Sequence, residues 1–197
     1  MEPDVQAIRD AIRKKYAEVS RNAEGRFAYP TGRRGAEALG YDPKLMDVVP
    51  PEAWPCFCGV GNPFALGAIV TGERVLDVGC GAGVDLIVAG RLVGPAGRVC
   101  GIDLTPEMVE RARANLISIE VLHAEVQEAS SEAIPYPEDS FDLVIANGAL
   151  NLSPQKDRTF REILRVLRPG GRLQIADIVL RADLPPEEAS SLDAWSQ

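Results

Sequence analysis

The sequence predicts an α/β fold with a doubly wound, mostly parallel sheet, and three observations lead to this prediction. After Pro63, short apolar segments alternate with segments of helical periodicity, which is the pattern of parallel strands with helices on both faces. Residues 75–85, VLDVGCGAGVD, pass from an apolar strand through closely spaced glycines into a second apolar pattern. The 197 residues, of which 46% are hydrophobic, are enough for one substantial core.

The first 62 residues have a different pattern, and we expect them to form a helical lid. Apolar residues recur at helical spacing between charged ones, and they predict one amphipathic helix from about residue 4 to residue 23: Val5, Ile8, Ile12, Tyr16 and Val19. Residues 25–63 are rich in Gly and Pro, with Asp42 and Pro43 placed as the cap and first residue of a short helix. We therefore interpret residues 1–62 as a cover over the substrate and residues 63–197 as the core.

The strands and helices of the core are expected in alternation. The predicted strands are residues 74–79, 98–103, 124–129, 141–147 and 172–179. The predicted helices lie near residues 84–92, 106–121 and 156–167. The last helix has Arg165 and Arg168 near its carbonyl end, Pro169 prevents its continuation, and Gly170 with Gly171 turns the chain into the last strand.

The glycine-rich loop after the first strand indicates the kind of ligand. Gly79, Gly81 and Gly83 give G-x-G-x-G, whereas the dinucleotide fingerprint is G-x-G-x-x-G. Asp77 precedes the first glycine, and a carboxylate there would repel a pyrophosphate but attract the ammonium of an amino acid. Asp103 closes the second strand, where a carboxylate can accept hydrogen bonds from both ribose hydroxyls. A ribose and an amino-acid cation without phosphates describe S-adenosylmethionine.

Four segments in order, VLDVGCGAG, GIDLTPEMVERARANL, PYPEDSFDLVIAN and RVLRPGGRL, resemble successive motifs of the class I S-adenosylmethionine-dependent methyltransferases, which have a Rossmann-like fold. The resemblance implies the following cofactor-binding residues: Asp77, Gly79, Cys80, Gly81, Gly83, Asp103, Leu104, Met108, Ser130 and Asn147. Asp77 and the glycine loop would face the methionine part, Asp103 the ribose, and Leu104 with Met108 the adenine. Family members often have an acidic residue after the third strand, and Ser130 stands at that position here.

Two further segments, CGVGNPFALG and NGALNLSPQKDRTFREILRVLRPGG, resemble the arsenite methyltransferase group within this family. In that group cysteine thiolates hold the metalloid, because trivalent arsenic is soft and thiophilic. Val60 and Gly148 stand where the group has two of its cysteines, although Cys56 and Cys58 lie near Val60 in the sequence. We interpret the chain as a relative without the arsenic chemistry, and arsenite methylation stays an alternative.

The reaction that the resemblance implies is direct methyl transfer to a small molecule. The cofactor is already activated, so the protein has to align the reactants and exclude water, and no catalytic residue is assigned. The expected substrate contacts are Tyr29, Gly148 and Asn151, and Asp177 is a candidate base on position alone. His123 is expected at the surface. A module that binds the cofactor without catalysis is a second alternative, and the glycine spacing argues against a dehydrogenase.

Composition and charge indicate which classes of binding partner and which compartment to expect. The chain has 29 acidic and 21 basic residues, a formal charge of −8 and no cluster of Lys or Arg, which argues against nucleic acid. The N-terminus is acidic, and no apolar run approaches the roughly 20 residues that span a bilayer, so neither a signal peptide nor a membrane is expected. The 4 cysteines are too few and too irregular for a disulfide framework, which fits the cytoplasm. No metal site is predicted.

The C-terminal part raises a separate expectation. The sheet of the resembled family ends in an antiparallel hairpin of two further strands, but residues 184–197 are typical of a helix. The hairpin is therefore expected to be missing, which would make residues 172–179 an edge strand with apolar side chains, namely Leu173, Ile175, Ile178 and Val179. We expect either a piece of a longer protein or a homodimer that covers this edge.

Overall fold

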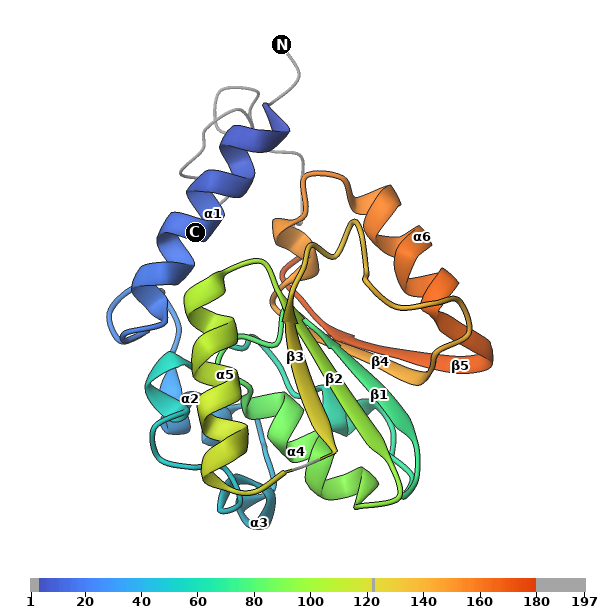
Figure 1. The fold of residues 1–197 in the computed structure, drawn as a ribbon. Helices are drawn as coiled ribbons and strands as arrows, with labels where there is room; N and C mark the ends of the chain where they lie inside the picture. Colours follow the sequence, from blue (N-terminus) through green and yellow to red (C-terminus); the bar gives the residue numbers. More distant parts are fainter. Residues whose placement is uncertain (1–3, 122, 180–197) are drawn as a thin grey trace.

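The computed structural model describes residues 4–121 and 123–179. Its centre is a five-stranded sheet in the order β3-β2-β1-β4-β5, and every neighbouring pair is parallel (Figure 1). The strands are β1 Arg74–Val78, β2 Arg98–Asp103, β3 Ala124–Glu128, β4 Phe141–Asn147 and β5 Leu167–Ala176. The order reverses between β1 and β4, so their carboxyl ends form the edge where ligands bind in open α/β sheets. The predicted fold class is confirmed.

Helices cover both faces of the sheet because the strands are apolar on both sides. The core helices are α4 Val84–Val93, α5 Pro106–Ser118 and α6 Lys156–Val166. Val75 and Leu143 pack in one apolar cluster with α4 and α5. Leu76 and Val144, the next residues along β1 and β4, pack in the other cluster with Ile163 of α6. This alternation is the period of two that a strand imposes, and it makes the sheet doubly wound.

Two core elements end or begin elsewhere than predicted. α5 stops at Ser118 and not near residue 121, and Glu120 then takes a left-handed backbone with φ 54°. β5 starts at Leu167, before the expected residue 172, because Leu167 pairs with Phe141 while Arg172 pairs with Leu143. The residues between Leu167 and Arg172 form a bulge that contains the proline and the two glycines.

The first helix, α1 Val5–Val19, lies beside the start of α5, beyond the carboxyl ends of the strands (Figure 1). Asp4 caps it by accepting hydrogen bonds from the backbone N–H groups of the next turn. Of the predicted apolar stripe, Ile8, Ile12 and Val19 are buried, whereas Val5 and Tyr16 are half-buried. The helix ends at Val19, four residues before the expected end.

The rest of the cover is made of short elements: α2 Gly32–Ala38, α3 Pro43–Met46 and the 3₁₀ turns η1 Trp54–Cys56 and η2 Pro63–Leu66. Asp42 accepts from the N–H of Lys44 and Pro43 is the first residue of α3, as predicted. Met46, Trp54 and other apolar side chains of the cover share one cluster with α4 and α5. The cover therefore packs onto the core, and the division at residue 62 stays a prediction.

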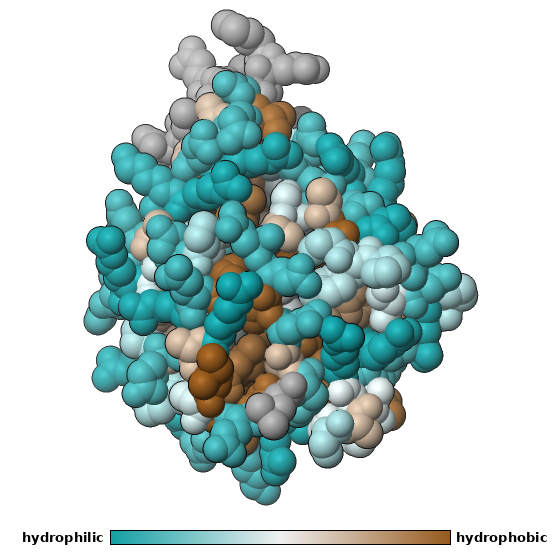
Figure 2. Space-filling model, viewed as in Figure 1, coloured by the Kyte–Doolittle hydropathy of each residue, from teal (hydrophilic) through white to brown (hydrophobic). Residues whose placement is uncertain are grey.

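The surface of the described residues and the edge of the sheet test the expectations about a membrane and about an exposed edge strand. Figure 2 shows a mostly hydrophilic face with apolar side chains gathered in its lower half. None of the described helices is long and apolar enough to cross a membrane. Among the described strands β5 lies at the edge, where Leu173 and Ile175 pack against the core. The strand ends at Ala176 and not at the expected residue 179, so Ile178 and Val179 lie after it and are exposed. The expected helix at residues 184–197 lies outside the described residues.

Candidate functional site

A cavity opens to solvent at the carboxyl ends of β1, β2, β3 and β4. It contains most of the residues that were expected at the cofactor, which come from the ends of four strands: Asp77, Gly79, Cys80, Gly81, Asp103, Leu104, Met108, Ser130 and Asn147. Gly148, expected at the substrate, also lines it. Residues of α1 and of the η1 region line its other side, including Ile12, Tyr16 and Phe57. The structure therefore brings the lid and the sheet together around one site.

The glycine loop is shaped by two close approaches. Gly79 has φ 77°, and a Cβ there would lie 2.3 Å from the Cβ of Ala149, so only glycine fits. Gly81, with φ 52°, has open space where a Cβ would be. Gly83 does not line the cavity, because its place is at the start of α4, where a Cβ would lie 3.3 Å from Ala112 of α5. Gly79 and Gly81 thus shape the cavity, whereas Gly83 serves the packing of two helices.

Asp77 is the residue with the most unusual environment. Its side chain is 2% exposed, and its Oδ2 atom is buried without a hydrogen-bond partner among the described residues. Burial raises the pKa of Asp77 well above its ordinary value, and the neighbouring carboxylates of Asp85 and Asp103 raise it further. An ammonium group beside Oδ2 would provide the missing partner and neutralise the charge. The site fits the amino-acid end of S-adenosylmethionine.

Asp103 is held in one orientation by the backbone. Its Oδ1 accepts from the N–H of Thr105 and its Oδ2 from the N–H of Gly81, both at 2.9 Å. Burial raises the pKa of Asp103, although these hydrogen bonds act in the opposite direction. Each carboxylate oxygen has a further lone pair, so Asp103 can also accept from two ribose hydroxyls.

Asn147 at the end of β4 joins the cover to the core. Its Oδ1 accepts from the N–H of Val60 at 2.8 Å, and its Nδ2 donates to Oδ2 of Asp85 at 3.0 Å. Tyr41 donates its hydroxyl to Oδ1 of Asp85 at 2.7 Å. Burial raises the pKa of Asp85 to about 6, while the hydrogen bonds from Tyr41 and Asn147 oppose the rise. Neither Asp85 nor Tyr41 was expected from the sequence: Asp85 stands two residues after Gly83, and no local pattern indicates Tyr41.

The positions discussed for arsenic chemistry lie together in the structure. A Cβ on Gly148 would lie 3.3 Å from Cγ1 of Val60, so these residues are neighbours and offer no thiol. Cys56 and Cys58 both line the cavity. Burial raises the pKa of Cys58 to about 12, with a further contribution from Asp103, and burial also raises the pKa of Cys56. Both thiols are therefore protonated at neutral pH.

Three other residues that were expected near the substrate lie outside the cavity lining, namely Tyr29, Asn151 and Asp177. Tyr29 donates its hydroxyl to the carbonyl oxygen of Cys58 at 3.0 Å, so it holds the loop that carries this thiol. Asp177 accepts from the N–H groups of Leu150 and Asn151 with one oxygen, which fixes the turn η3 Leu150–Leu152. The contacts of Asp177, the candidate base, are thus with backbone amides. His123, which contacts the carbonyl oxygen of Gly90 at 3.0 Å, is also absent from the lining.

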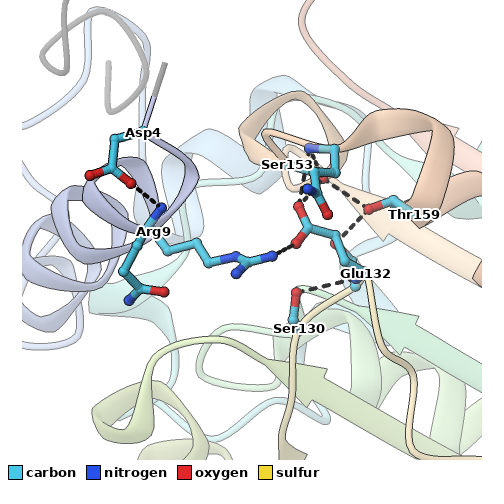
Figure 3. A network of polar contacts seen from close by, with 9 residues as sticks. Asp4, Arg9, Ser130, Glu132, Ser153 and Thr159 are labelled. Atoms are coloured by element: carbon cyan, nitrogen blue, oxygen red, sulfur yellow. Dashed lines mark hydrogen bonds and ion pairs between the residues drawn. The ribbon is translucent and has the colours of Figure 1, made fainter. Parts of the chain in front are cut away.

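A polar network on the β3 side of the cavity was not expected from the sequence (Figure 3). Arg9 of α1 forms an ion pair with Glu132, which is 2% exposed and follows β3. Ser153 donates to Oε1 of Glu132 at 2.7 Å, and the N–H of Gln155 donates to the same oxygen. Burial alone would raise the pKa of Glu132, but the hydrogen bonds from Arg9 and Ser153 hold it below its usual value. Because 123 residues separate the pair in sequence, no spacing pattern could reveal it.

Comparison with known proteins gives one consistent family. Residues 69–197 match the family model described as a methyltransferase domain. The chain is 36% identical over 198 residues to an arsenite methyltransferase of Halobacterium salinarum, which covers 93% of this chain but 50% of that protein. It is 37% identical over 122 residues to the aklanonic acid methyltransferase DauC of a Streptomyces species, covering 60% of this chain and 56% of the relative. The chain thus spans about half the length of these relatives.

Solved structures agree with the sequence relatives. CrArsM, an arsenic(III) S-adenosylmethionine methyltransferase from Chlamydomonas reinhardtii, has a TM-score of 0.62 and 34% identity, covering 83% of this chain and 54% of the other. A SAM-dependent methyltransferase from Aquifex aeolicus has a TM-score of 0.57 and 27% identity, covering 75% and 80%. The sequence relatives and the solved structures therefore support the same fold and the same family.

The environment of Asp77 predicts that its carboxylate weakens the ligand-free protein. The pKa of Asp77 is raised in the folded state, so folding favours the protonated carboxyl group. The contribution of this group to stability is complete below the pKa that it has in the unfolded chain, and it is lost as the pH rises through the pKa of the folded state. We expect Asp77→Asn to increase the free energy of unfolding by about 1–3 kcal/mol at roughly pH 8, and the gain to vanish below about pH 4.

Urea unfolding at a series of pH values measures this effect. Asp157→Asn is the matched control, since Asp157 is exposed in the first turn of α6 and should change little at any pH. An Asp77→Asn protein that is less stable than the wild type at the higher pH contradicts the prediction.

Proposed function

The chain belongs to the class I S-adenosylmethionine-dependent methyltransferases, and from this premise we propose that it transfers a methyl group from that cofactor to a small molecule. The unpaired Oδ2 of buried Asp77 is the observation that supports the proposal most strongly. It lies in the same cavity as Asp103, so the cavity offers a site for a cation next to a site for a ribose. A dinucleotide would place a pyrophosphate near Asp77 and would be repelled.

The residues of the cavity have distinct roles in the proposed reaction. When bound, the cofactor supplies a methyl group already activated by the sulfonium, for displacement by a nucleophile. Asp77 would hold the ammonium and Asp103 the ribose, while Gly81 leaves space beside the loop. Ile12 and Phe57 line the cavity from the lid and exclude water from the reacting groups. Catalysis would then come mainly from alignment of the two reactants.

Composition supports further parts of the proposal. The formal charge of −8 favours a small-molecule substrate over nucleic acid. The cysteines are all free, which fits a reducing cytoplasm. A homodimer that covers the edge of β5 also stays a prediction. A module that binds the cofactor but does not catalyse is distinguished by turnover of labelled cofactor in the presence of a metabolite extract.

Calorimetric titration with S-adenosylmethionine, its demethylated product S-adenosylhomocysteine and NAD tests the proposed cofactor. We expect binding of the first two and weaker or no binding of NAD. Asp103→Ala should weaken binding by several-fold to about a hundredfold, because the ribose hydroxyls lose a charged acceptor. Asp157→Ala, on the exposed side of α6, is the control and should bind as the wild type does. Tighter binding of NAD than of the other two would refute the proposal.

Arsenite is the second candidate acceptor, because Cys56 and Cys58 line the cavity. We nevertheless expect no methylated arsenic when the protein is incubated with arsenite, S-adenosylmethionine and glutathione, since Val60 and Gly148 offer no thiolate. Mass spectrometry of the arsenic species gives the result. Methylated arsenic that disappears in Cys56→Ser and Cys58→Ser variants would show that the displaced pair binds the metalloid.

A further inference from the structure

Arg9 of α1 has a hydrogen-bond donor that the fold leaves unused. Its guanidinium lines the cavity and pairs with Glu132 through Nη2 (Figure 3). The Nε atom of the same side chain is buried and has no hydrogen-bond partner among the described residues. A buried donor without a partner destabilises the protein, so an acceptor on the occupant of the cavity would satisfy this N–H.

The order of the strands places Arg9 at one end of the proposed cofactor. Asp77 lies one residue before the end of β1, Asp103 ends β2 and Ser130 follows β3, and these three strands are neighbours in that order. An amino-acid end at Asp77 and a ribose at Asp103 therefore direct the base toward Ser130. Arg9 reaches the same side, because its partner Glu132 lies two residues after Ser130. The lid helix thus meets the cavity at the base end of the cofactor.

A second arginine of α1, Arg13, also holds the helix against the core on this side of the cavity. Arg13 donates from Nε to the carbonyl oxygen of Leu104 at 3.2 Å, directly after β2. The side chains of Leu104 and Met108, which the resemblance assigns to the adenine, line the cavity next to this contact. The position of Arg9 over the base end therefore follows from two separate contacts of α1 with the core.

The acidic residue of this region is not available to an adenine amine. One oxygen of Glu132 accepts from Ser153 and Gln155, and the other is paired with Arg9. Ser130 accepts from the N–H of Glu132 at 3.2 Å and retains its own hydroxyl proton as a donor. The hydroxyl of Ser130 and the Nε–H of Arg9 are therefore side-chain donors left for a base, and the ring nitrogens of adenine are acceptors.

Building on the proposed function, we propose that Arg9 is a cofactor-binding residue whose Nε–H donates to a ring nitrogen of the adenine, with Glu132 as the residue that positions it. The lid would then read the base directly, in addition to covering the site. The attachment of α1 to the core and the recognition of adenine would then share one guanidinium, which makes both contacts.

Titration of deaza analogues tests the proposal. The probes are S-adenosylhomocysteine and its 1-deaza, 3-deaza and 7-deaza forms, each of which replaces one ring nitrogen by a carbon that cannot accept a hydrogen bond. We expect the wild type to bind one of the three about tenfold more weakly than the parent compound. Arg9→Lys keeps a cation for Glu132 but loses Nε, so it should bind the parent about tenfold more weakly and show no further loss with that analogue.

The controls separate the possible explanations. Arg21→Lys changes an exposed arginine after the end of α1 and should leave all affinities unchanged. If Arg9→Lys binds every probe more weakly than the wild type by the same factor, or binds all of them as the wild type does, Arg9 only holds α1 in place. Either result would overturn the inference. Equal affinity of the wild type for all three analogues would overturn it even if the variant did not fold. A wild type that binds no S-adenosylhomocysteine refutes the proposed cofactor itself, which is a distinct result.

Discussion

Negative charge buried without compensation is the constraint on which this site depends. Asp77, Asp85 and Asp103 meet at the carboxyl ends of β1 and β2, and burial raises the pKa of each. Asp103 and Asp85 have hydrogen-bond donors within the protein, whereas Asp77 keeps one oxygen without a partner. A fold that places a carboxylate in this way loses stability unless a cation binds there. The amino-acid end of the cofactor supplies that cation, which links the stability of the site to its function.

The lid is attached to the same region through contacts between distant parts of the chain. Tyr41 and Val60 of the cover meet Asp85 and Asn147 of the core, and Arg9 of the first helix meets its partner after β3. The apolar cluster beneath these contacts contains residues of both parts, so the cover is built into the core and not merely laid over it. Methyl transfer requires that the two reactants are aligned and that water is excluded. Both requirements then depend on these few polar contacts between the cover and the core.

The local parts of this structure could be predicted from the sequence, because their causes are local. The alternation of strands and helices, the glycine turn after β1 and the cap formed by Asp42 each depend on neighbouring residues. The predicted start of β5 was wrong, because a bulge keeps the proline-glycine segment inside the strand. Arg9 and Tyr41 were missed because tertiary packing alone brings Arg9 to the cavity and Tyr41 to Asp85. Tyr29 was expected at the substrate, but it lies outside the cavity lining and its hydroxyl supports a loop.

Proton exchange on binding tests the role of the buried carboxylate most directly. The heat of binding S-adenosylhomocysteine at about pH 6, measured in buffers of different ionisation enthalpy, gives the number of protons that the complex releases or takes up. Because an ammonium beside Asp77 lowers its raised pKa, our account predicts that binding releases protons and becomes tighter as the pH rises toward neutrality. Binding that releases no protons, or takes them up, would contradict the account.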